Sequence, residues 1–261
     1  PLIKEMVFNY QKRETAMDDT GARRYKELWD GLADNVSSAY YFVDGSQSED
    51  EIRLRGSELA ESLIKALDIQ TKDKVLEFGC GVARIGRELS PKCQEWYGCD
   101  ISSKMIEIAT SRTSHLPNIY LQHIESTSLN CYSDDSFEKV YTIGVFIHMY
   151  KEDIYRILCE IYRVLKPGGV FSCGMWNILR PGAWRLWEKH LREDSPIIIH
   201  TWTSPGELQT FVTKAGFKII AVIDQSEYTI QLILSKGITE ANCVPDALMG
   251  DHTLFVGGAL E

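Results

Sequence analysis

Residues 75–86 read Val75-Leu76-Glu77-Phe78-Gly79-Cys80-Gly81-Val82-Ala83-Arg84-Ile85-Gly86. An apolar strand pattern ends in an acid and enters a Gly-x-Gly turn, after which a helix pattern begins. Because glycine has no Cβ, the backbone of such a turn can bend sharply and approach a ligand closely. In a sheet whose strands alternate with helices, this turn lies outside the carboxyl ends of the strands, where ligands bind. The segment therefore predicts a ligand-binding loop, with an ordinary strand-to-helix turn as the alternative.

Strand and helix patterns alternate along the chain on both sides of this loop. The runs typical of strands are 74–78, 95–99, 119–123, 139–143 and 170–175. The runs typical of helices are 82–89, 104–111 and 151–165, the last of which is expected to stop at the turn Lys166-Pro167-Gly168-Gly169. Strands separated by helices of this length are parallel and are joined by right-handed crossovers. The pattern predicts a doubly wound α/β fold with a mostly parallel sheet.

The rest of the chain is organised around this alternation. Residues 1–47 are expected to form an N-terminal helical extension, and residues 48–235 the main domain. Within that domain, residues 176–203 contain four tryptophans and little clear periodicity. We interpret them as an insertion on the substrate side of the sheet. Residues 236–261 are expected to form a C-terminal segment.

Two parts of the chain carry weaker local signals. In the extension, a helix pattern over 23–33 is followed by an aromatic and turn-rich piece at 39–45. Near the C-terminus, three runs resemble strands, at 217–223, 228–234 and 253–256. Which of these runs forms the last strand of the sheet stays open.

Composition narrows the functional class. The chain has 261 residues, 44% of them apolar, and a net charge of −9, which suits one large globular domain. Its pI of about 5.3 disfavours nucleic acid as a partner, because binding to phosphates normally needs a basic face. No apolar run approaches the roughly 18 residues of a membrane span.

The seven cysteines include no C-x-x-C pair, which predicts reduced thiols in a cytoplasmic protein with no metal site.

A second acid narrows the choice of ligand. Asp100 ends the next predicted strand, in Tyr97-Gly98-Cys99-Asp100-Ile101-Ser102, where a carboxylate can accept hydrogen bonds from both ribose hydroxyls. The competing ligand is a dinucleotide, but Arg84 occupies the position of its third glycine. Glu77 would also repel a pyrophosphate. The acids suit a nucleoside cofactor that has a cationic centre and no phosphate.

Taken together, the segments E-F-G-C-G (77–81), Y-G-C-D-I-S (97–102) and L-K-P-G-G (165–169) resemble the motif series of the class I S-adenosylmethionine-dependent methyltransferases. The resemblance covers roughly residues 50–175. It implies a Rossmann-like, seven-stranded sheet, the cofactor S-adenosyl-L-methionine, and methyl transfer to a small-molecule acceptor.

The resemblance also implies which residues bind the cofactor. Asp100 is expected to hold the ribose hydroxyls, while Ile101 and Met105 pack against the adenine. Glu125 is the candidate for the adenine amino group, one methylene longer than the more usual Asp; a solvated loop acid is the alternative. The full set expected to contact the cofactor is Glu77, Phe78, Gly79, Cys80, Gly81, Arg84, Asp100, Ile101, Met105, Ile124, Glu125, Ser126, Ile143 and Gly144.

His148 is the candidate catalytic residue. It lies in the stretch after the fourth strand, Thr142 to Met149, which in the family passes under the transferred methyl group. A histidine there can act as a general base, since its unperturbed pKa suits proton removal at neutral pH. The alternative is a structural histidine, hydrogen-bonded where the next helix begins.

Aromatic side chains in the extension and the insertion are expected to form a lid. Tyr25, Trp29 and Phe42 belong to this group, as does Trp187. Core packing, or a subunit interface in a homo-oligomer, is the alternative. The residues expected to contact the acceptor are Tyr40, Tyr41, His148, Trp176, Trp184, His200 and Trp202.

The leading hypothesis is therefore a methyltransferase that acts on O, N or C of a small molecule. A regulatory or scaffold protein that binds the cofactor without transfer is one alternative. A nicotinamide-dependent oxidoreductase on a similar sheet is another. RNA or protein methylation is disfavoured by the negative charge and by the lack of an added binding domain.

Overall fold

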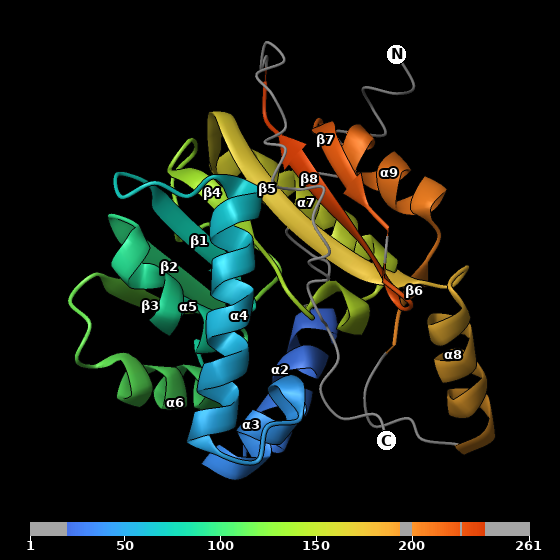
Figure 1. Cartoon of the computed structure of the whole chain (residues 1–261), viewed down its shortest axis with the longest axis horizontal. Coiled ribbons are helices and arrows are strands. Elements are labelled where there is room, and N and C mark those ends of the chain that lie inside the picture. Colours follow the sequence, from blue (N-terminus) through green and yellow to red (C-terminus); the bar gives the residue numbers. More distant parts are fainter. Residues whose placement is uncertain (1–19, 194–199, 225, 238–261) are drawn as a thin grey trace.

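The computed structural model describes residues 20–193, 200–224 and 226–237, and a twisted sheet runs through its centre (Figure 1). The strands are β1 Lys74–Phe78, β2 Glu95–Asp100, β3 Ile119–His123, β4 Phe137–Tyr141, β5 Leu165–Asn177, β6 Trp202–Thr203, β7 Lys218–Ile223 and β8 Thr229–Ser235. Their order is β3-β2-β1-β4-β5-β8-β7, and β6 pairs with β5 beside this path. The strands β1 to β5 pair in parallel, whereas β8 is antiparallel to both β5 and β7.

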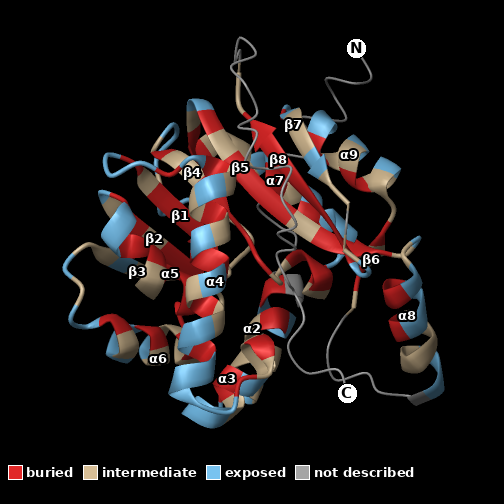
Figure 2. Ribbon diagram, viewed as in Figure 1, coloured by how far each residue is buried: buried red, intermediate tan, exposed pale blue. Residues whose placement is uncertain are grey.

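Helices cover both faces of the sheet. They are α2 Thr20–Leu32, α3 Val36–Asp44, α4 Glu49–Leu67, α5 Arg84–Leu89, α6 Ser103–Thr113, α7 Lys151–Val164, α8 Pro181–Glu193 and α9 Pro205–Lys214, with short 3₁₀ turns η1 Ser90–Lys92 and η2 Phe146–His148. One face packs against α4, α5 and α6, and the other against α7 and α9. The helices α2 and α3 lie near the carboxyl ends of β1 and β2 (Figure 1). Figure 2 shows buried sheet strands and helices whose outer sides are exposed.

The doubly wound, mostly parallel α/β fold is confirmed. Seven strands form the main path of the sheet, and the eighth is the two-residue β6 inside the predicted insertion. The runs at 217–223 and 228–234 both belong to the sheet, and β8 lies between β5 and β7. The run at 253–256, like most of the predicted C-terminal segment, lies outside the described residues. The predicted domain limits stay predictions.

Two predictions of irregular structure are wrong. The piece at 39–45 is mostly helical, because α3 is capped at both ends: the Asn35 side chain accepts the Ser38 N–H, and Gly45 takes a left-handed conformation with φ of 80°. The insertion also contains a helix, α8. Its buried face carries Ala183 and Leu186 at helical spacing, but Trp184 is exposed outside that face.

Two predicted boundaries also move. The helix expected over 82–89 begins at Arg84, because Ala83 adopts a left-handed φ of 56°. The turn expected at 166–169 lies within β5, where the pairing with β4 shifts register between Phe137 and Lys139. Among the described residues, no helix is long and apolar enough to span a membrane.

The indole of Trp96 fills the space between β2 and α5. Trp96 is fully buried, and two glycines leave room for its ring. A Cβ at Gly86 would lie 2.1 Å from Trp96 Cζ2, and one at Gly98 would lie 2.3 Å from Cη2. Both glycines therefore permit close packing.

We expect Gly86→Ala to lower the free energy of unfolding by about 1–3 kcal/mol, since the added methyl would overpack a rigid ring. Gly206→Ala is the matched control, because nothing lies within 4 Å of the Cβ position at Gly206. Urea denaturation of both variants measures the difference. Equal stability of the two variants would contradict the packing role of Gly86.

Candidate functional site

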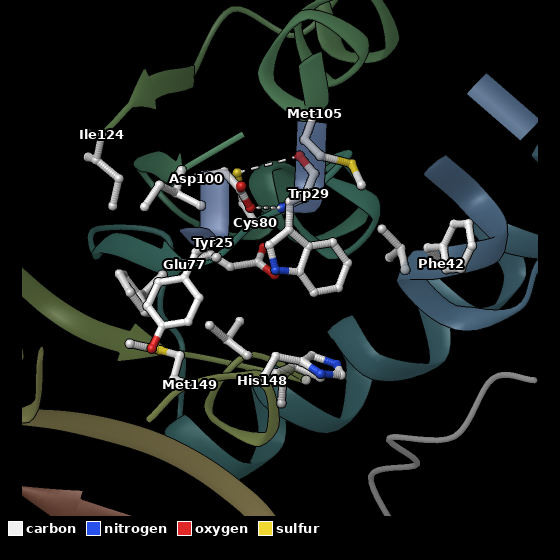
Figure 3. Close-up of a pocket in the computed structure, with 18 of the residues that line it drawn as sticks. Tyr25, Trp29, Phe42, Glu77, Cys80, Asp100, Met105, Ile124, His148 and Met149 are labelled. Carbon is white, nitrogen blue, oxygen red and sulfur yellow. Dashed lines mark hydrogen bonds between the residues drawn. The ribbon is translucent and has the colours of Figure 1, made fainter. Parts of the chain in front are cut away.

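A cavity opens at the carboxyl ends of β1, β2 and β4, where the strand order reverses direction, and it continues to the residues after β3. About 900 Å³ of space free of protein atoms lies within and in front of it, open solvent at its mouth included. Figure 3 shows Asp100 and Met105 on one side and His148 and Met149 on the opposite side. The sequence-predicted loop acids thus face the same cavity as His148.

The residues predicted to contact a cofactor gather in this cavity, with one exception. Those that line it are Glu77, Phe78, Gly79, Cys80, Gly81, Arg84, Asp100, Ile101, Met105, Ile124, Ser126, Ile143 and Gly144. Glu125 is exposed and is not among the lining residues, although its neighbours Ile124 and Ser126 are. The contact roles of all these residues stay predictions.

The glycine loop after β1 needs glycine at two positions. Gly79 and Gly81 have φ of 74° and 51°, in the left-handed region that side chains disfavour. A Cβ at Gly79 would also lie 2.3 Å from a methyl carbon of Val145. The loop therefore packs tightly against the segment that leads to His148.

Asp100 anchors the loop through its carboxylate. Its Oδ2 accepts the Gly81 N–H at 2.8 Å, and its Oδ1 accepts the Ser102 N–H at 2.9 Å. Burial raises the pKa of Asp100, and the two backbone donors act in the opposite direction. The carboxylate thus presents a buried, oriented charge to the cavity.

Glu77 is the second buried acid of the cavity. Its Oε2 accepts the Tyr141 hydroxyl at 2.8 Å. Burial raises the pKa of Glu77 to about 8, while Tyr141 and the charge of Arg84 lower it and Asp100 raises it. Arg84 itself is buried and forms an ion pair with Asp44 of α3, with Nη1 and Oδ2 3.3 Å apart.

Helix α2 is held at two points, Tyr25 and Asp30, beside the cavity. The Tyr25 hydroxyl donates to Asp153 Oδ2 at 2.7 Å and accepts the Tyr150 N–H at 2.9 Å. Further along the helix, Asp30 Oδ1 accepts the Ser102 hydroxyl at 2.7 Å. These bonds position the intervening residues of α2, and Tyr25 and Trp29 line the cavity.

His148 belongs to the turn η2, and its ring joins the cavity to an aromatic cluster. It contacts Trp29 with ring centroids 5.2 Å apart, and it lies 6.5 Å from Trp176 and 5.6 Å from His200. Behind it, His200 stacks on Trp176 at 5.0 Å. His190 lies 4.2 Å from His200, yet among the described residues no group of three His, Cys, Asp or Glu could hold a metal ion.

Burial affects the charge of this cluster. The pKa of His200 falls to about 3, because burial disfavours the charged ring and because His148 and His190 lie nearby. His200 is therefore neutral at neutral pH, and it places no cation next to His148.

The residues predicted to contact the acceptor, apart from His148, are absent from the lining. Tyr40 is a buried residue of α3 whose hydroxyl donates to Glu49 Oε2, and Tyr41 is exposed. Trp176 and Trp202 pack on each other with centroids 4.5 Å apart, behind His148. Trp184 is exposed on α8. From the predicted lid, the lining includes Tyr25, Trp29 and Phe42.

Four lining residues were not predicted as site residues: Val43, Thr127, Val145 and Met149. Val43 comes from α3, which sequence periodicity did not reveal. Its caps, Asn35 and Gly45, were the available signal. Thr127 and Met149 lie in loops, so only the tertiary fold brings them to the cavity.

Thr201 connects the insertion to the turn that carries His148. Its N–H donates to Ile147 O at 2.7 Å, and its hydroxyl donates to Met149 O at 2.6 Å. The two bonds flank His148 on either side. Residues of the insertion thus contact the cavity indirectly, through the backbone of η2.

Thr201→Val should lower the free energy of unfolding by about 1–3 kcal/mol, because it leaves the carbonyl of Met149 without its donor. Thr201→Ser retains the hydroxyl and should lose less. Urea denaturation measures both variants, and equal losses for Val and Ser would show that the hydroxyl bond does not hold the turn.

Comparison with known proteins identifies the domain. A family model described as a methyltransferase domain matches residues 75–169. The chain is 31% identical over 141 residues to Methyltransferase GfsG of Streptomyces halstedii, covering 53% of this chain and 49% of that protein. It is 30% identical over 151 residues to demethylmenaquinone methyltransferase of Staphylococcus haemolyticus, covering 57% and 60%. The chain thus spans about half the length of the curated relatives it matches.

Solved structures agree on the fold. The magnesium protoporphyrin IX methyltransferase ChlM of Synechocystis, with bound SAH, superposes with a TM-score of 0.59 at 16% identity, over 76% of this chain and 91% of that one. The YcgJ protein of Bacillus subtilis superposes with a TM-score of 0.56 at 18% identity, over 69% and 99%. Residues 75–169 thus match the model of a methyltransferase domain, and the chain shares its fold with these solved structures.

Proposed function

We propose that this protein transfers the methyl group of S-adenosylmethionine to a small, uncharged, largely apolar acceptor. The observation that carries the proposal is the division of one cavity into two chemically different halves. The buried carboxylates of Glu77 and Asp100 belong to the side of the glycine loop, and His148 and Met149 lie on the side opposite Asp100 (Figure 3).

The acidic half fits the cofactor. S-adenosylmethionine has a cationic sulfonium, an ammonium group and a ribose, and it supplies an activated methyl group when bound. Asp100 is buried and oriented, as a ribose contact requires. Glu77 offers a negative charge to a cationic ligand, and left-handed glycines let backbone approach closely. Ile101 and Met105 supply apolar surface for a flat base.

The other half favours an acceptor without charge. Tyr25, Trp29, Phe42, Val145 and Met149 form apolar or aromatic walls. The one basic side chain with a fixed charge in the lining, Arg84, is already paired with Asp44. A phosphate or carboxylate on the acceptor would thus lack a cationic partner.

The names of two relatives are consistent with the same kind of acceptor. One is a demethylmenaquinone methyltransferase. Another, the O-methyltransferase cnsE of Penicillium expansum, is 26% identical over 82% of this chain and 79% of that protein. Both names are consistent with an organic acceptor methylated on carbon or oxygen.

Within this proposal the residues of the chain act mainly by position. The walls of the cavity hold the acceptor in line with the methyl group, which in well-oriented systems supplies up to about 7–11 kcal/mol of the barrier reduction. His148 takes the proton from an acceptor hydroxyl. Helix α2, fixed by Tyr25 and Asp30, excludes water from the reacting atoms.

Calorimetry tests the cofactor half. We expect S-adenosylmethionine and S-adenosylhomocysteine to bind, and NAD to show no measurable affinity. Asp100→Asn should weaken binding of S-adenosylhomocysteine by about 1–3 kcal/mol, because ribose hydroxyls lose a charged acceptor. Glu125→Gln is the matched acid control. If it weakens binding equally, Glu125 turns into the cavity when the ligand is bound. Tight NAD binding alone would refute the proposal.

Release of S-adenosylhomocysteine from a panel of acceptors tests the transfer. Phenols and quinols should be methylated, and phosphorylated amines should not. With the best acceptor, Trp29→Ala should lower kcat/KM by about tenfold or more through loss of packing surface, while Trp184→Ala, which alters an exposed side chain outside the lining, should not. Cofactor binding without release from any acceptor would favour the regulatory alternative.

A further inference from the structure

Three side chains on neighbouring strands form a buried hydrogen-bond chain that ends at the cavity. The Trp96 indole Nε1 on β2 donates to the Tyr141 hydroxyl at 3.0 Å, and that hydroxyl donates to Glu77 Oε2 at 2.8 Å. Trp96 and Tyr141 are fully buried, and Glu77 is only 2% exposed. Glu77 and Tyr141 are also direct partners in the pairing of β1 with β4.

The direction of this chain follows from its first member. An indole N–H can only donate, so the Tyr141 oxygen must accept from Trp96. The single Tyr141 proton is then available for Glu77 Oε2. If Oε2 carried a proton of its own and donated it, the buried Tyr141 hydroxyl proton would be left without an acceptor, which is costly. Oε2 is therefore an acceptor, and a protonated Glu77 carries its proton on Oε1.

On the basis of the proposed function, we propose that Tyr141, oriented by Trp96, is a positioning residue that directs the proton of Glu77 to Oε1, from which it is released to solvent when the cationic cofactor binds. No covalent bond changes in this step. The O–H bond at Oε1 breaks, the buffer accepts the proton, and the carboxylate keeps the electron pair.

The surroundings of Glu77 make the release large enough to measure. Burial raises its pKa to about 8, so the ligand-free protein holds this proton at pH 7. The charged groups that act on it are Arg84, which favours the carboxylate, and Asp100, which opposes it. Arg84 is shared with Asp44. A bound cation adds a second attraction and lowers the pKa of Glu77, so affinity should rise with pH up to about 8.

Calorimetry of S-adenosylmethionine binding in phosphate and in Tris, two buffers of different ionisation enthalpy, counts the protons released. At pH 7 the wild-type protein should release close to one proton, and at pH 8 about half of one. Affinity should be about tenfold or more tighter at pH 8 than at pH 6. 5′-Methylthioadenosine, which has neither the ammonium nor the carboxylate of the amino-acid part, should bind without proton release.

The variants separate positioning from simple packing. Tyr141→Phe keeps the ring but removes the donor that stabilises the carboxylate, so the pKa of Glu77 should rise by about one unit or more. At pH 8 this variant should release close to one proton. Glu77→Gln should release none, which also excludes Asp100 as the source. Tyr97→Phe is the matched control, because the Tyr97 hydroxyl bonds to Glu95 outside the cavity. It should behave like the wild type.

If Tyr141→Phe does not fold, as judged by circular dichroism, Trp96→Phe removes the indole donor and should shift proton release in the same direction. Wild-type protein that binds the ligand without releasing a proton, or Tyr141→Phe with an unchanged proton count at pH 8, would overturn the inference and leave the proposed function intact. Absence of binding by either adenosyl compound to the wild type would instead overturn the proposed function itself.

Discussion

The carboxylate of Asp100 is the constraint on which the site depends. It joins the glycine loop after β1 to the start of α6, since its two oxygens accept backbone N–H groups from Gly81 and Ser102. The N–H groups of Gly79 and Cys80 meanwhile donate to Cys99 O at 2.8 and 3.0 Å. The loop is thus held to β2 by backbone and side chain together. Because the serine that Asp100 helps to orient also donates to Asp30 of α2, the same carboxylate is linked to the helix beside the cavity.

Burying carboxyl groups under this loop has a cost that depends on pH. The pKa of Glu77 rises from 4.5 to about 8 on folding. For an acid whose folded pKa is raised, the ionised form is disfavoured in the fold, so this group destabilises the protein progressively from pH 4.5 upward until it ionises near pH 8. A bound cation offsets that loss, because a ligand that binds the folded state adds stability by mass action. A bound cation therefore restores stability that the burial of Glu77 removes from the ligand-free protein.

The glycines of the motif have separate physical reasons, which a motif alone does not distinguish. Gly79 and Gly81 need left-handed backbone. Gly86 and Gly98 instead clear space for the Trp96 ring, which in turn holds Tyr141 against Glu77. The packing of Trp96 beside the sheet therefore affects how the Glu77 carboxylate is held in the cavity.

Sequence periodicity was sufficient for the sheet because buried parallel strands alternate with amphipathic helices such as α7, whose apolar stripe is continuous. Sequence periodicity failed where a helix is short or exposes apolar side chains outside its buried face. In α3, Tyr40 and Phe42 disfavour helix intrinsically, and the caps and tertiary contacts overcome that preference. In α8 the exposed Trp184 and Leu191 break the pattern.

The residues of the candidate site also differ in this respect. Some are placed by local sequence patterns, and others only by tertiary packing. The loop acids Glu77 and Asp100 could be located from sequence, because strand ends of a parallel sheet converge on one edge. The walls around His148 could be located only in part: Trp29 was expected in a lid, whereas Val43 reaches the cavity only through the packing of α3. No sequence spacing specifies that packing.

The insertion illustrates why an aromatic-rich segment need not contact a ligand in order to affect it. Its tryptophans lie behind His148, where Trp176 and His200 pack against the histidine ring. Thr201 fixes the backbone on both sides of the same residue. Since the neutral His200 contributes no charge, the cluster acts on His148 through packing. Residues of the insertion therefore constrain the position of His148 through packing and backbone hydrogen bonds, although its tryptophans are absent from the cavity lining.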